Sequence, residues 1–185
     1  CYISLAKDVL KGTGIQVAST LNFPQANDTL DMKLAALKEM IKTGVDQFDF
    51  PPNPGLLIGG EEKAYFEEMK QIVEVAHASG VIVKSMLEFG FLNEEQKKKA
   101  AQLACEAGID WVKQSSGWGV GGCAATVEDV KILKENISLP CRVKVSGKVN
   151  SLEKMKMMFE AGAELVGTSS GPEIIEGLIG DPNAY

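Results

Sequence analysis

A glycine that closes an amphipathic segment and leads directly into a short apolar run occurs three times in this sequence. The copies are Thr43-Gly44-Val45-Asp46, Ala107-Gly108-Ile109-Asp110 and Ala161-Gly162-Ala163-Glu164. Glycine is common just beyond the last residue of a helix, and short apolar runs are typical of buried strands. The spacing fits β/α units of about 30 residues. The sequence therefore predicts strands that alternate with helices and form a parallel sheet.

The same pattern places the individual elements. Six strands are expected, at residues 16–21, 45–50, 81–87, 110–113, 140–145 and 164–167. Helices are expected at residues 3–10, 30–42, 61–78, 93–108, 126–136 and 150–162, with a short one after the last strand. Asn93 and Gln96 have capping-box spacing, and Asn150 and Glu153 are expected to cap the helix that they begin.

The regular repeat favours an α/β fold of the (β/α)8 TIM-barrel type over a doubly wound sheet. A closed barrel of this type has eight strands, so the first two β/α units are expected to be missing from this chain. We therefore predict one barrel domain over residues 1–185 that is incomplete at its N-terminus. The two edge strands carry neither lysine nor proline to protect them, which predicts about 40–60 further residues before Cys1 in the native protein.

Composition excludes several classes of function. The formal net charge is −6 and no basic block occurs, which argues against nucleic acid as a partner. No apolar run is long enough to cross a membrane. The single histidine, His77, and four cysteines without C-x-x-C spacing predict no metal site. Reduced cysteines are typical of the cytoplasm, where we expect this protein.

Charged residues stand near the ends of four neighbouring strands. They are Asp49, Lys84, Lys113 and Lys144, each roughly one β/α repeat from the next. Because chemistry collects at the carboxyl ends of barrel strands, these side chains are expected to converge in the mouth. The alternative is a single structural Asp–Lys pair, with the other lysines extending to water.

Two converging lysines point to amine catalysis. Ammonium groups about 4 Å apart repel each other by roughly 4 kcal/mol at an effective dielectric constant of 20. That energy equals about 3 pKa units, enough to bring one of the two lysines, Lys113 or Lys144, towards neutrality. A neutral amine attacks a carbonyl and forms a Schiff base. Asp49 would then transfer protons, directly or through a water molecule.

Two clusters of small residues predict a phosphate site at the same end of the barrel. One is Ser146-Gly147, and the other is Gly167-Thr168-Ser169-Ser170-Gly171, between the last strand and the last helix. In such loops backbone N–H groups can approach an anion closely. Gly147, Ser169 and Ser170 are therefore expected to bind phosphate.

A third glycine cluster, Gly117-Trp118-Gly119-Val120-Gly121-Gly122, fits the dinucleotide pattern. The next strand carries Lys144 where such a site needs an acidic residue, so no nicotinamide cofactor is expected. The cluster is instead expected to border the active site, where Gly117 and Lys84 would contact the substrate.

Four of these segments resemble those of the deoxyribose-phosphate aldolase family. Trp111-Val112-Lys113-Gln114-Ser115-Ser116-Gly117 is similar to the segment with the Schiff-base lysine, and Val143-Lys144-Val145-Ser146-Gly147 to the second lysine strand. Asp46-Gln47-Phe48-Asp49 resembles the strand of the catalytic aspartate, and the segment from Gly167 to Gly171 the phosphate loop.

This resemblance implies a class I aldolase that reversibly cleaves 2-deoxyribose 5-phosphate to glyceraldehyde 3-phosphate and acetaldehyde. It also implies that no cofactor is needed, and it suggests nucleoside and carbohydrate catabolism in the cytoplasm and a homodimer. The sequence departs from the family at Ala18, where many members have cysteine, and at Asn22 and Lys148, where glycine is usual. Two alternatives stay open: a related Schiff-base aldolase for another phosphorylated sugar or aldehyde, and a phosphosugar-binding barrel without activity.

Overall fold

The computed structural model describes residues 2–181. Within them, six strands form a curved parallel sheet. Its strands are hydrogen-bonded in chain order from β1 to β6. They are β1 Ala18–Thr20, β2 Gln47–Phe50, β3 Ile82–Met86, β4 Trp111–Lys113, β5 Arg142–Ser146 and β6 Leu165–Gly167. All six expected strands are confirmed, with bounds one or two residues shorter at most ends.

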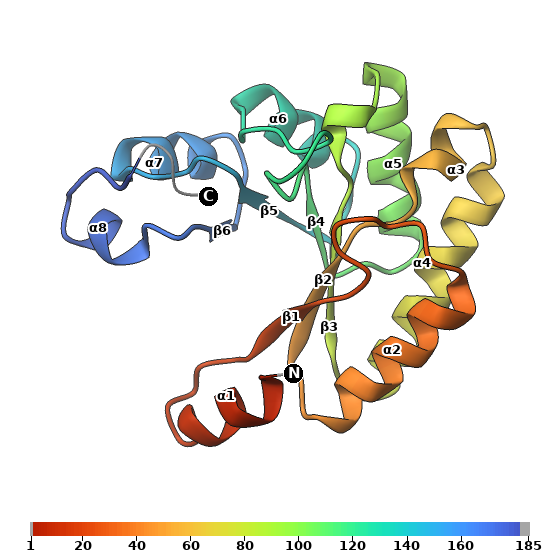
Figure 1. Cartoon of the computed structure of the whole chain (residues 1–185). Helices are drawn as coiled ribbons and strands as arrows, with labels where there is room; N and C mark the ends of the chain where they lie inside the picture. Colours follow the sequence, from red (N-terminus) through yellow and green to blue (C-terminus); the bar gives the residue numbers. More distant parts are fainter. Residues whose placement is uncertain (1, 182–185) are drawn as a thin grey trace.

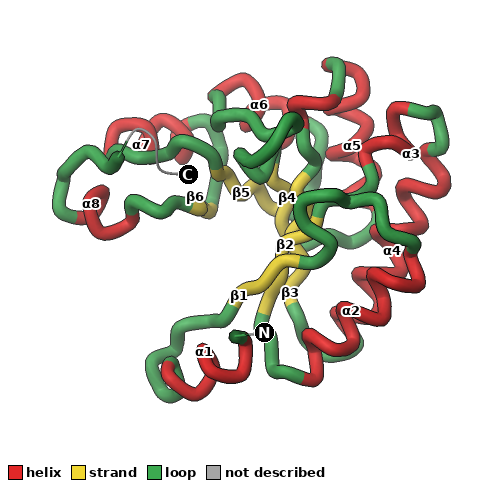
Figure 2. The backbone as a smooth tube through the Cα atoms, in the orientation of Figure 1, coloured by secondary structure: helices red, strands yellow, loops and turns green. Residues whose placement is uncertain are grey.

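The helices lie mostly along the convex side of the sheet, where they form an outer layer (Figure 1). They are α1 Ile3–Val9, α2 Leu30–Lys42, α3 Pro54–Ile58, α4 Glu62–His77, α5 Glu94–Glu106, α6 Val127–Glu135, α7 Leu152–Glu160 and α8 Gly171–Ile175, with a 3-10 turn at Phe89–Phe91. The backbone makes an open arc whose two ends carry α1 and α8 (Figure 2). The sheet is thus a six-stranded half-barrel. Among residues 2–181 no helix has the length and apolar character that a membrane span requires.

Two local predictions need correction. Ser151, rather than Asn150, caps α7, because its side chain accepts a hydrogen bond from the Lys154 N–H. Asn150 is buried instead, and its backbone oxygen accepts from the N–H of Gly180. Helix α3 was not expected; it begins after Asn53, whose side chain caps it by accepting from the Gly55 N–H. The capping box of Asn93 and Gln96 is confirmed.

Alternation along the strands separates the core from the concave face. Phe48, Val83, Val112 and Val143 have no exposed surface and belong to the core cluster that packs under the helices. Their neighbours in the sequence point to the other side of the sheet, since successive strand residues face opposite ways. These neighbours are Asp49, Lys84, Lys113 and Lys144. The alternation therefore directs all four charged side chains towards the inside of the arc.

The register of the sheet places these residues at two levels. Asp49 pairs with Lys84, and Lys113 pairs with Lys144. Between β3 and β4, however, Lys113 pairs with Met86, two residues beyond Lys84. Lys84 therefore lies one inward-facing position deeper than Lys113. The sequence spacing predicted a single level, because it does not reveal this stagger between neighbouring strands.

Candidate active site

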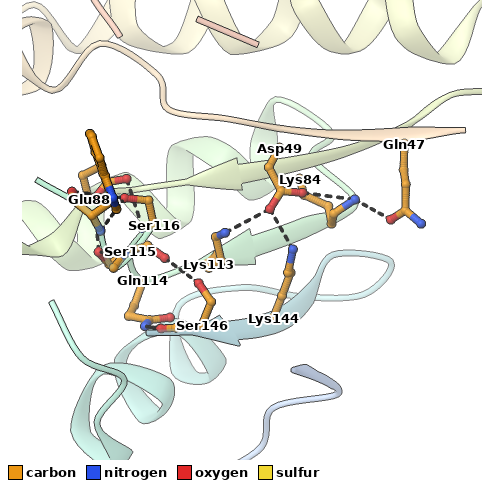
Figure 3. A network of polar contacts seen from close by, with 12 residues as sticks. Gln47, Asp49, Lys84, Glu88, Lys113, Gln114, Ser115, Ser116, Lys144 and Ser146 are labelled. Atoms are coloured by element: carbon orange, nitrogen blue, oxygen red, sulfur yellow. Dashed lines mark hydrogen bonds and ion pairs between the residues drawn. The ribbon is translucent and has the colours of Figure 1, made fainter. Parts of the chain in front are cut away.

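Three lysine side chains contact the carboxylate of Asp49 (Figure 3). Lys113 Nζ and Lys144 Nζ donate to Asp49 Oδ2 at 2.9 and 2.7 Å. Lys84 Nζ lies 3.1 Å from Oδ1 of the same carboxylate. The side chains of Lys84, Lys113 and Lys144 are only 2%, 5% and 13% exposed. The predicted convergence is therefore confirmed, and the alternative of lysines that extend to water is wrong.

This charge cluster shifts the pKa values of its members. Burial alone would raise the pKa of Asp49, but the ammonium groups of Lys113, Lys144 and Lys84 outweigh it and hold that pKa far below its usual range. Burial, together with repulsion from Lys144 and Lys113, lowers the pKa of Lys84 to about 8 against the attraction of Asp49. Burial and the charge of Lys113 also lower the pKa of Lys144. The cluster thus holds a charged carboxylate beside two lysines, Lys84 and Lys144, whose pKa values are lowered.

A cavity of about 410 Å³ opens above this cluster. Asp49, Lys113 and Lys144 line it. The remaining lining residues are Thr20, Phe23, Met86, Ser116, Trp118, Ser146, Gly167, Thr168 and Ser169. Lys84 shares the level of Asp49, but it does not line the cavity, because its side chain turns down the sheet and also donates to the side-chain oxygen of Gln47. The structure therefore places Lys84 beside Asp49 on the neighbouring strand and outside the lining of the cavity.

Two aromatic side chains at the cavity were not singled out from the sequence. The rings of Phe23 and Trp118 lie 6.0 Å apart between centroids, at an angle of 55°. Phe23 follows β1 and Trp118 follows β4, and both residues line the cavity. Trp118 is the one large aromatic side chain inside a glycine-rich loop after a lysine strand, which is a signal that sequence reasoning could have used.

Serine and carboxylate contacts fix the chain beyond Lys113. Glu88, whose φ is +48°, accepts from the Ser116 N–H at 3.0 Å and from Ser115 Oγ at 3.1 Å. Burial raises the pKa of Glu88 in spite of these hydrogen bonds. Gln114 Nε2 donates to the backbone oxygen of Ser146 at 2.5 Å, which ties the ends of β4 and β5 together. These contacts keep the two lysine strands in one relative position.

The glycine-rich segment from Gly117 to Gly122 is shaped by close packing. A Cβ at Gly122 would lie 2.3 Å from the Trp118 nitrogen, and one at Gly121 would lie 2.0 Å from the Phe91 ring. Gly117 has a φ of +78° and donates its N–H to Ser115 Oγ at 2.9 Å. Gly117 is not among the cavity-lining residues. Close packing at Gly121 and Gly122 and positive φ angles at Gly117 and Gly119 thus explain the glycine pattern that resembles a dinucleotide motif.

The two predicted phosphate loops lie together at one side of the cavity. Ser169 lines the cavity, beside Gly167 and Thr168. Gly147 has a φ of +94°, and a Cβ there would lie 2.7 Å from the Cys123 oxygen. Ser170 is 3% exposed and donates its N–H to Thr168 Oγ1 at 3.0 Å. Within residues 2–181, no group of three or more His, Cys, Asp or Glu side chains could hold a metal ion.

The fold and the site together define a parallel β/α half-barrel with a two-lysine, one-aspartate centre, the arrangement of a lysine-dependent aldolase. No model of a protein family matches the chain. The chain is 37% identical over 177 residues to deoxyribose-phosphate aldolase of Caldanaerobacter subterraneus subsp. tengcongensis, covering 95% of this chain and 76% of that protein. It is 40% identical over 181 residues to the deoxyribose-phosphate aldolase of Staphylococcus carnosus, covering 97% of this chain and 80% of that protein.

Solved structures agree with these relatives. The tetrameric deoxyribose phosphate aldolase of Aeropyrum pernix superposes with a TM-score of 0.84 at 26% identity, covering 95% of this chain and 73% of that one. An aldolase called QR15 superposes with a TM-score of 0.86 at 30% identity, covering 95% of this chain and 76% of its own. The chain therefore belongs to the deoxyribose-phosphate aldolase family. This confirms the family and the lyase class that the sequence motifs predicted.

Proposed function

We propose that this chain cleaves 2-deoxyribose 5-phosphate reversibly to glyceraldehyde 3-phosphate and acetaldehyde through a Schiff base on Lys113. The observation that carries the proposal is the convergence of Lys113 and Lys144 on one carboxylate at the floor of the cavity. Names of relatives at 37% and 40% identity support the substrate. The alternative of a binding barrel without activity is disfavoured, because the whole ionisable centre is retained.

Lys113 is the proposed nucleophile. Its neutral amine adds to the aldehyde carbon of the open-chain sugar, and loss of water leaves an iminium ion. The iminium accepts the electron pair of the C2–C3 bond as that bond breaks, while the C3 hydroxyl loses its proton and becomes the aldehyde of the departing product. The enamine that remains takes up a proton at C2, and water then releases acetaldehyde from Lys113.

Lys144 is the proposed carrier of these protons. The sequence suggested Asp49 for this task, but a carboxylate whose pKa is held so low is a poor base near neutral pH. The lowered pKa of Lys144 suits proton transfer better, and Lys144 lines the cavity. Asp49 then orients both amines and stabilises whichever of them is charged, while Lys84 pairs with the other oxygen of Asp49 from the neighbouring strand.

The phosphate group is proposed to bind at Gly147 and Ser169. Neither backbone N–H donates to an acceptor among the residues that the structure describes. Ser170 shapes the loop instead, since its N–H is engaged with Thr168 Oγ1. Gly117 contributes by packing, because a Cβ at Gly147 would lie 3.4 Å from the Gly117 Cα. The substrate would thus extend from the lysines to the loops after β5 and β6.

A closed eight-stranded barrel is the proposed complete form. The edges of β1 and β6 are unpaired ends of the present sheet, and the chain spans 76–80% of its curated relatives. Two further β/α units between those edges would pair both. We further propose a cytoplasmic homo-oligomer, supported by a tetrameric relative and tested by light scattering; a dimer is the form the sequence suggested.

The activity is tested by incubating the protein with 2-deoxyribose 5-phosphate and measuring acetaldehyde release. Unphosphorylated 2-deoxyribose and other phosphorylated sugars are compared in parallel. We expect cleavage of the phosphorylated deoxy sugar and none by Lys113→Ala. Faster release from another phosphorylated sugar would favour the related-aldolase alternative. Full activity in Lys113→Ala would overturn the assignment of the nucleophile.

A further inference from the structure

A buried ion pair lies behind the mouth of the half-barrel, outside the cavity. Lys33 in α2 and Glu68 in α4 approach to 2.9 Å between Nζ and Oε2, with side chains 0% and 7% exposed. Neither residue lines the cavity. Because desolvation offsets most of the attraction, a buried pair is weak evidence for stability. We therefore infer the role of this ion pair from the backbone groups to which its two side chains are hydrogen-bonded.

Each member of the pair holds one loop at the carboxyl end of the sheet. Lys33 Nζ donates to the backbone oxygen of Ala26 at 2.7 Å, in the loop between β1 and α2. Glu68 Oε1 accepts from the Asn53 N–H at 2.9 Å, in the loop between β2 and α3. The pair thus fastens the loop after β1 to the loop that follows the strand of Asp49.

The first of these loops carries Phe23. Asn22 and Ala26, on either side of it, have φ angles of +50° and +62°, which non-glycine residues adopt at a cost. The Ala26 N–H donates to the Asn22 oxygen at 3.0 Å and closes the turn. Such a turn keeps its shape only where surrounding contacts fix it. Hydrogen bonds between Asn22 and Asp28 supply such contacts on the exposed side, and Lys33 supplies one from the buried side.

We propose that Lys33 and Glu68 are positioning residues for substrate binding. Through the Ala26 oxygen they hold Phe23 against Trp118, and the resulting aromatic wall of the cavity sets the affinity for the sugar. The pair lies behind this wall and acts only through it. The kinetic part of this proposal rests on the proposed function, whereas the positioning part does not.

The main test is the variant Lys33→Met/Glu68→Gln. It removes both buried charges together, and the new glutamine oxygen can still accept from the Asn53 N–H. We expect the KM for the phosphorylated sugar to rise about five- to tenfold with kcat within about twofold. Phe23→Ala should give a similar rise. The two changes combined should give no more than Phe23→Ala alone, because they act through one ring.

A matched control removes a different ion pair, which lies away from the cavity. Lys7→Met/Asp46→Asn eliminates the contact of 2.7 Å at the opposite end of β2, and it should leave KM unchanged. Glu68→Gln alone, the second variant, keeps Lys33 Nζ as the donor to the Ala26 oxygen, but it leaves that ammonium group without its buried partner and so costs more stability than the double variant. It should change KM in the same direction by a smaller factor.

A fluorescence measurement without substrate tests the positioning of Phe23 against Trp118 independently of enzymatic activity. In a Trp111→Phe background, Trp118 is the one remaining tryptophan. We expect acrylamide to quench its fluorescence more strongly in the Lys33/Glu68 variant, to the level of Phe23→Ala, and unchanged in the control. Wild-type quenching in that variant, or KM effects that add to those of Phe23→Ala, would overturn the proposal. A parent protein without turnover would contradict the proposed function alone, and quenching would still decide the positioning.

Discussion

Replacing Asp49 by asparagine removes the carboxylate that pairs with three buried lysines. The side chain keeps its size, so the packing of the cluster is preserved. The substitution abolishes the two hydrogen-bonded ion pairs of 2.9 and 2.7 Å and the third ion pair, of 3.1 Å, with Lys84. The three ammonium groups then repel one another without compensation. Asp49→Asn therefore measures how much the carboxylate stabilises this cluster.

The expected loss is large compared with the stability of a domain. Removing one partner of a buried ion pair costs about 3–5 kcal/mol, against a total of about 5–15 kcal/mol for a folded domain. The lysines can reduce this loss by releasing protons. Lys84 already shows the tendency, since its pKa is about 8 with Asp49 present. Without the carboxylate, the pKa values of Lys84 and Lys144 fall further.

The stability of the variant therefore depends on pH in a defined direction. Where a lysine is protonated in the unfolded chain but not in the folded one, stability rises with pH. For wild-type Lys84 this window runs from about 8 to 10.5. In Asp49→Asn the pH range over which stability rises begins at a lower pH, because the folded-state pKa values of the lysines are lower. The destabilisation should thus shrink as pH rises from 6 to 8, by up to about 1.4 kcal/mol per pH unit for each lysine that titrates there.

Urea denaturation of wild type and variant at several pH values measures this difference. Asp46→Asn is the control, because Asp46 faces the partly exposed Lys7 at the other end of the strand. Its effect should be small and nearly constant between pH 6 and 8. A destabilisation by Asp49→Asn that stays constant, or grows, as pH rises would refute the reasoning about buried ammonium groups.

Three further substitutions probe the cavity. Lys144→Met removes a positive charge beside Lys113, so borohydride trapping should become half-maximal at a higher pH; an unchanged profile would contradict the electrostatic coupling. Gly167→Ala places a Cβ 3.3 Å from Lys144 Cε, so kcat should fall several-fold at a nearly unchanged melting temperature; loss of the fold would point to a structural role. Gly147→Ala should raise the KM of the phosphorylated sugar more than that of acetaldehyde, and equal rises would argue against a phosphate contact there.

Much of the fold followed from the sequence because its signals are local. Glycines after helices, apolar strand runs and the capping box of Asn93 each depend on neighbouring residues alone. The helix over Leu30–Lys42 has the predicted bounds. Helix α3 was missed because five residues around Pro54 are too few to show a helical period. Asn150 has the same capping-box spacing to Glu153 as Asn93 has to Gln96, so the sequence favours it over its neighbour Ser151, the actual cap.

The sequence predicted those parts of the candidate site that follow from the repeat spacing. It did not predict those that depend on the stagger between neighbouring strands. Repeat spacing brought Lys113 and Lys144 together, and the register confirms that they pair. The same spacing placed Lys84 at the cavity, whereas the shift between β3 and β4 sets it one inward-facing position deeper than Lys113, beside Asp49. The meeting of Phe23 and Trp118 could not be inferred, because it depends on how two loops far apart in sequence fold over the cavity.

Formation of the Schiff base on Lys113 is the step on which the proposed activity depends. Its most direct test is to treat the protein with acetaldehyde and sodium borohydride, digest it and map the modified peptide by mass spectrometry. We predict one ethyl group per chain, on Lys113, and none in Lys113→Ala. An ethyl group on Lys144 instead, or no stoichiometric modification at all, would contradict this assignment.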